Sequence, residues 1–163
     1  MSNPASTTSA ISNGMEARIL REGFGPGSWH GPNVKAALAD VTPELAFWRP
    51  AHERHNIAEI ALHHAYCERS VRGQLSGTTP EPFVLEGEDW FELPDANRLA
   101  WPEIVAALDA EHRRLDSLVT NIGAGQVPSP LTETERFDLV LGITCHAVYH
   151  AGQVQLIKRL YAK

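Results

Sequence analysis

Two histidines near the carboxyl end of the chain, His146 and His150, stand four residues apart in a segment with helical periodicity. Side chains at i and i+4 lie on one face of a helix, so both imidazoles can point at a single cation. That face also carries Ile143, Val154 and Ile157, which turns the two histidines toward the core. From this pair alone, a shared metal ion and hydrogen-bonded core histidines are equally good interpretations.

A third imidazole is offered upstream by His63 and His64, in another segment with helical periodicity. Neighbouring residues diverge by about 100° on a helix, so only one of the two can face the same point. Periodicity favours His64, which lies near the centre of the apolar face of this helix. His63 lies at the edge of that face, but a metal site between two helices could also use an edge position. Three histidines from two helices would hold a transition metal and leave a coordination position vacant, as in catalytic sites.

The other candidates for chemistry are weaker. His52 and His55 flank the start of the upstream segment, where capping or solvent exposure is expected. His112 stands in a charged run, and we expect it to be solvated. Cys67 and Cys145 lie in apolar helical runs, which predicts two buried free thiols.

The segments that must position the histidines have clear helix signals. Asn56 and Glu59 form a capping-box pattern that opens a helix expected over 56–75. The same pattern at Thr132 opens a helix expected to run to about Leu160. Further helical pieces are expected over 15–21, 32–39, 42–50 and 103–122.

No segment alternates convincingly at period two, so the sequence predicts an all-α fold: a four-helix bundle with a broken first helix and long connecting loops. Residues 78–98 combine prolines with aromatic residues and are typical of a loop that covers a site. Residues 1–13 are rich in Ser, Thr and Ala and are expected to form a flexible leader. Residues 14–163 are expected to form a single domain.

The composition limits the possible partners. Of 163 residues, 43% are hydrophobic and 21% charged, which is ordinary for a globular protein. The net charge is −6 and basic residues are scattered, so nucleic acid is not an expected partner. The chain has no apolar stretch of about twenty residues, which argues against a membrane span, and no signal-peptide pattern. We therefore expect a cytoplasmic protein.

Five segments form a recognisable pattern: Ser28–Pro32, Val41–Glu44, Trp48–Pro50, Glu59–His63 and His146–Gln153. They resemble the DinB/YfiT-like superfamily, over nearly the whole chain after about residue 14, and the closing His-x-x-x-His-x-Gly-Gln is the most specific part. The resemblance implies a four-helix bundle, often dimeric, that holds a divalent metal with three histidines. In that pattern the upstream ligand follows a glutamate by four residues, which selects His63 over His64.

The resemblance also implies the chemistry. It points to a metalloenzyme that holds zinc, nickel, iron or manganese through His63, His146 and His150 and works as an S-transferase with a small-molecule substrate and a low-molecular-weight thiol. A metal-dependent hydrolase and a non-catalytic bundle with a structural metal are the alternatives, and a homodimer is expected. Two positions depart from the family pattern: His64 replaces an apolar residue and Cys67 an aromatic one.

Overall fold

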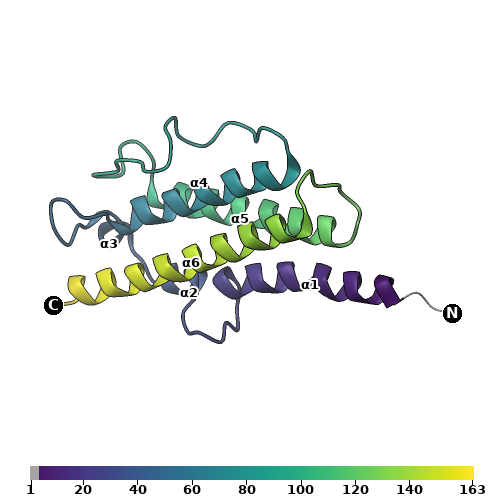
Figure 1. Ribbon diagram of the computed structural model, residues 1–163. Coiled ribbons are helices and arrows are strands. Elements are labelled where there is room, and N and C mark those ends of the chain that lie inside the picture. The colour runs from purple at the N-terminus through teal and green to yellow at the C-terminus, as the bar shows by residue number, and fades with distance from the viewer. Residues whose placement is uncertain (1–3) are drawn as a thin grey trace.

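The computed structural model describes residues 4–163, with side chains from residue 14 onward, and over this range it contains helices and loops but no strand (Figure 1). None of the described helices has the length and hydropathy needed to cross a bilayer. Four helices are long and two are short: α1 (Pro4–Phe24), α2 (Val34–Leu38), α3 (Pro43–Phe47), α4 (Ile57–Ser76), α5 (Trp101–Gly123) and α6 (Glu133–Tyr161).

The four long helices form a closed bundle. Helix α4 packs against α5 and α6, and α1 packs against the same two helices, so each long helix has two long neighbours. The short helices α2 and α3 pack on α6 and α4, respectively. The prediction of an all-α four-helix bundle is confirmed, and the long connection between α4 and α5 runs over one side of the bundle (Figure 1).

Local capping chemistry sets the ends of α4 and α6. The Asn56 side chain accepts a hydrogen bond from the Glu59 backbone N–H at 2.9 Å, and Glu59 in turn accepts from the Asn56 N–H. Gly77 ends α4 with a φ of 68°, a left-handed conformation that glycine adopts without strain. Thr132 and Glu135 form the predicted capping box at the start of α6.

Helix α1 differs from the expected short helix over 15–21. It begins at Pro4, so the backbone of residues 4–13 is helical within the segment predicted to be a leader, and residues 1–3 lie outside the described part. Proline suits the first turn of a helix, where its missing N–H has no intrahelical partner. Leu20 and Phe24 anchor the other end in the core, being 2% and 5% exposed.

The core has two apolar clusters with polar residues between them. One cluster includes Leu62 and Leu108, and the other includes Leu75 and Leu115. His112 lies between them and is only 7% exposed, so the expectation of a solvated histidine is wrong. The sequence contained a signal for this burial, because His112 lies on the inward face of α5, four residues after Leu108 and three before Leu115.

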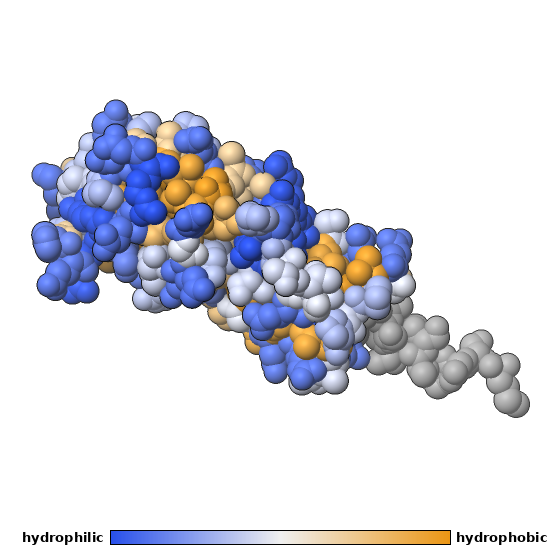
Figure 2. All heavy atoms as spheres, turned by 90° about the horizontal axis from the view of Figure 1, so that it is seen from above, coloured by the Kyte–Doolittle hydropathy of each residue, from blue (hydrophilic) through white to orange (hydrophobic). Residues whose placement is uncertain are grey.

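The outer face seen from above is mostly hydrophilic with small hydrophobic patches (Figure 2).

Candidate metal centre

The three histidines singled out in the sequence meet between α4 and α6. His146 Nε2 lies 3.0 Å from His63 Nε2 and 2.9 Å from His150 Nε2. The ring centroids of His63 and His150 are 5.2 Å apart. His63 and His150 are buried, with 6% and 4% exposure. The structure therefore brings one imidazole of α4 and two of α6 to one small volume.

Hydrogen bonds between the three imidazoles cannot satisfy all of their ring nitrogens. A ring nitrogen of a neutral imidazole carries either one proton or one lone pair, so it makes one in-plane hydrogen bond. His146 Nε2 nevertheless faces two imidazole nitrogens within 3.0 Å. A cation shared by the three lone pairs would satisfy all of them, and imidazole nitrogen is a preferred ligand of zinc and related ions. The donor set therefore fits a divalent transition metal.

Burial keeps these imidazoles in the form that binds metal. Burial, together with the neighbouring His150 and His63, lowers the pKa of His146 to about 4. Burial likewise lowers the pKa of His150 to about 4, although a hydrogen bond with Gln153 acts in the opposite direction. Both rings are consequently neutral at pH 7, with lone pairs available for a cation.

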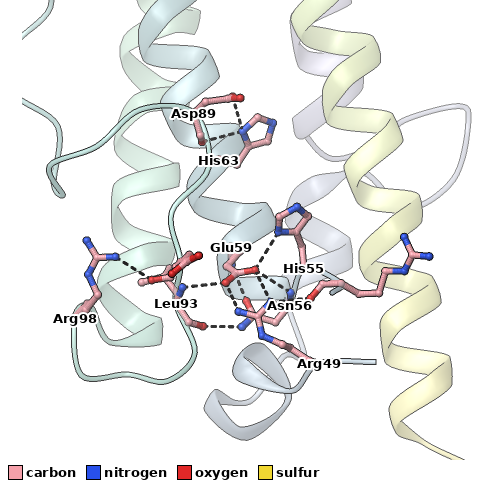
Figure 3. Close-up of polar contacts among 10 residues, drawn as sticks. Arg49, His55, Asn56, Glu59, His63, Asp89, Leu93 and Arg98 are labelled. Carbon is pink, nitrogen blue, oxygen red and sulfur yellow. Dashed lines mark hydrogen bonds and ion pairs between the residues drawn. The ribbon is translucent and has the colours of Figure 1, made fainter. Parts of the chain in front are cut away.

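The loop between α4 and α5 fixes the outer side of His63. His63 Nδ1 lies 3.0 Å from the backbone carbonyl oxygen of Asp89 and 3.1 Å from its carboxylate (Figure 3). Asp89 has a φ of 62°, which is uncommon for a residue other than glycine. These contacts hold the Nδ1 edge of the ring toward the loop, so that Nε2 points at α6.

Trp90 covers the same histidine. Its ring stacks on His63 at 3.9 Å and on His55 at 3.7 Å, with interplanar angles of 6° and 9°. Two imidazoles at these distances would overlap on one side of an indole, so they lie on its opposite faces. This stack confirms that the loop over residues 78–98 covers the histidine cluster.

A buried carboxylate anchors that loop to the start of α4. Glu59 accepts a hydrogen bond from the Leu93 N–H at 2.9 Å, and Asn56 donates its side-chain N–H to the Leu93 carbonyl at 2.7 Å (Figure 3). Arg49 and His55 also contact the Glu59 carboxylate. Burial alone would raise the pKa of Glu59, but these hydrogen bonds outweigh it and the pKa is lowered. Glu59 therefore positions the loop and lies outside the imidazole cluster.

His64 faces the other side of His146. The Nδ1 atoms of the two rings are 2.9 Å apart, and His64 Nε2 lies 3.6 Å from Glu68. Glu68 contacts His112 Nδ1 at 2.7 Å, and burial raises the pKa of its carboxyl. These buried groups form a polar chain from His146 into the core.

A cavity of about 530 Å³ adjoins the histidine cluster through the shared wall of Trp90 and His55. Arg49 and Arg54 also line it, whereas Arg69 donates to loop carbonyl groups elsewhere. The Arg49 guanidinium is engaged by Glu59, so Arg54 is the arginine of the three best placed to meet an acidic group in this cavity.

The two cysteines differ from the expected buried pair. Cys145 is exposed, because it follows the inward-facing Thr144 by one position and so points to the outer side of α6. Cys67 is partly buried, and its Sγ lies 3.8 Å from His63 Nε2. Ligand atoms of His63, Cys67 and His146 all lie within 4.8 Å of one another. Sequence reasoning missed this contact, although Cys67 follows His63 by four residues.

The fold and the histidine cluster define a helical bundle with a candidate centre for a divalent metal. A family model of the DinB superfamily matches residues 28–154, so the chain belongs to this superfamily. Its histidines and cysteine are compatible with metal binding. Comparisons with curated proteins and with solved structures gave no match.

Proposed function

We propose that this protein is a metalloenzyme that holds a divalent transition metal through His63, His146 and His150 and transfers a group to or from a low-molecular-weight thiol. The observation that carries the proposal is the approach of two imidazole nitrogens to His146 Nε2 within 3.0 Å. When bound there, the ion would lower the pKa of a thiol or water that enters its vacant position.

The surrounding residues would orient the ligands and limit access of water. Asp89 fixes His63, and Gln153 lies 2.6 Å from His150 Nδ1. With His146 Nε2 facing the ion, its Nδ1–H would donate to His64. Contacts of this kind to metal-bound imidazoles raise metal affinity. Trp90 excludes solvent from one face of His63.

The substrate class is tested by calorimetric titration of metal-loaded protein with bacillithiol, mycothiol and glutathione. We expect at least one of these thiols to bind in a metal-dependent manner and to be consumed with an electrophilic cosubstrate. Hydrolysis of esters or amides without thiol binding would favour a metal-dependent hydrolase. A metal that only raises the melting temperature, with no turnover of either panel, would favour a structural metal.

Replacing His150 by alanine is expected to abolish stoichiometric metal binding, because only two of the three proposed histidine ligands, His63 and His146, would remain. Elemental analysis after gel filtration measures this loss. At about 100 times the Kd, metal should stabilise the native protein by about 2.7 kcal/mol and the variant negligibly. His52→Ala, at an exposed position of the adjoining cavity, is the matched control and should keep the metal. Unchanged metal content in His150→Ala would refute the ligand set.

The choice between the neighbouring histidines of α4 is tested by two further variants. His63→Ala should lose stoichiometric metal, since its Nε2 is the only α4 imidazole nitrogen within 3.0 Å of His146 Nε2 in the described structure. His64→Ala should keep the stoichiometry but weaken affinity roughly 10- to 100-fold, the usual cost of losing a residue that orients a ligand. The reverse order of effects in metal titrations would identify His64 as the ligand.

A further inference from the structure

The two helices that face each other at the centre each carry a pair of metal-binding side chains at four-residue spacing. Helix α6 provides His146 and His150, and α4 provides His63 and Cys67. Side chains at this spacing lie one turn apart on the same face of a helix. Two facing pairs of this kind offer four donors to one ion, three nitrogens and one sulfur.

Cys67 lies near two of the three histidines of this set, His63 and His146. Its Sγ lies 3.8 Å from His63 Nε2 and 3.9 Å from His63 Nδ1, and the three ligand atoms of His63, Cys67 and His146 are mutually within 4.8 Å. Two ligands with bonds of about 2.3 Å for sulfur and about 2.0 Å for nitrogen lie at most about 4.3 Å apart. The His63–Cys67 pair falls within that limit. Because the sulfur is almost equidistant from the two ring nitrogens, ligation would require a change of the Cys67 rotamer that moves it toward the lone pair of Nε2.

Cys67 packs against the apolar cluster that contains Leu75 and Leu115, and its sulfur lies on the side of His63. Cys67 forms no disulfide, and among the described residues its only polar contact is with His63. An apolar side chain at position 67 could pack against the core equally well. The cysteine instead places a sulfur atom beside His63, an imidazole of the proposed ligand set.

We infer that Cys67 is a fourth protein ligand of the metal, completing a site of three histidines and one cysteine. The inference rests on the proposed function. Ligation breaks the S–H bond, forms a metal–sulfur bond and releases the proton to solvent, with no change in oxidation state. A thiolate favours zinc over manganese, because it is a soft ligand. A thiol substrate would then displace this thiolate or occupy a fifth position, to which zinc sites can expand.

Cobalt(II) substitution of the full-length protein tests the inference. A cysteine thiolate bound to cobalt gives a charge-transfer band in the near ultraviolet that histidine ligands do not give. We expect one such band at one cobalt per chain in the native protein. Cys67→Ser should lose the band and bind cobalt at least roughly 10-fold more weakly, because loss of a direct ligand should cost no less than loss of a residue that orients one.

Cys145→Ser is the matched control, because Cys145 is the only other cysteine and is exposed on α6. This variant should keep the full band, and it tests the sulfur source even if Cys67→Ser does not fold. Cobalt bound stoichiometrically without the band, or a band lost in Cys145→Ser, would overturn the inference and leave the three-histidine site standing. Failure of the native protein to bind cobalt would overturn the proposed metal centre itself, and the role of Cys67 with it.

Discussion

Replacing Glu59 by alanine is expected to lower the free energy of unfolding by about 3 kcal/mol, the lower end of the cost of breaking a buried ion pair. The Glu59 side chain is only 2% exposed and accepts hydrogen bonds from Arg49 and from the Leu93 and Asn56 backbone N–H groups. Its removal leaves those donors without their acceptor. Urea unfolding followed by circular dichroism measures the loss.

Two variants test whether the loss of stability comes from removal of the buried charge or from mutation in general. Glu59→Gln retains an oxygen that can accept from Leu93 but lacks the charge that pairs with Arg49, so its stability should be intermediate. Glu53→Ala removes an exposed carboxylate from the segment just before α4 and should change stability by less than about 0.5 kcal/mol. Equal stabilities of Glu59→Ala and Glu53→Ala would contradict the anchoring role of Glu59.

Helix ends could be predicted from the sequence because their signals are local. The capping boxes at Asn56 and Thr132 and the glycine at 77 each act within one turn, and the structure places α4 and α6 within a residue or two of the predicted bounds. The amino-terminal end of α1 was not predicted, although Asn3 and Pro4 form a residue pair typical of a helix start. The Ser-, Thr- and Ala-rich residues that follow them favour a flexible segment by composition, and that composition decided the prediction.

Periodicity predicted burial better than it predicted chemistry. His64 lies at the centre of the buried face of α4 and is 1% exposed, as the pattern implied. The imidazole cluster, however, forms between α4 and α6 under a loop, where the edge residue His63 faces His146 Nε2. A hydrophobic pattern measures distance from solvent and contains no information about which neighbouring helix a side chain meets.

Contacts between segments that lie far apart in the chain could not be predicted from the sequence. The stacking of Trp90 on His63 depends on how a loop of more than twenty residues folds back over α4. The pairing of Glu68 with His112 depends on the relative rotation of α4 and α5. Both follow from packing of whole elements, which no short pattern specifies.

The metal-free protein is expected to lose stability as the pH falls from about 6.5 toward 4. The native pKa values of His146 and His150 are lowered to about 4, whereas an unfolded histidine has a pKa of about 6.5. Between these values the unfolded chain binds more protons than the native state, so stability falls with acidification. Each such proton contributes at most about 1.4 kcal/mol per pH unit, and less for the partly exposed His146.

Urea unfolding in the presence of chelator, repeated at intervals between pH 7 and pH 4.5, measures this dependence. Glu68 acts in the opposite direction, because its raised pKa lets the native state take up a proton before the unfolded chain. Burial raises the pKa of Glu16 in the same way, but it lowers the pKa of His64 as well as those of His146 and His150, so three histidines against two carboxyls still give a net loss in acid. His150→Gln should flatten the curve by removing one titrating group, whereas His52→Gln, at an exposed position, should not. Stability that stays constant from pH 7 to pH 5 in the native protein would mean that the imidazoles do not sit neutral and buried between α4 and α6.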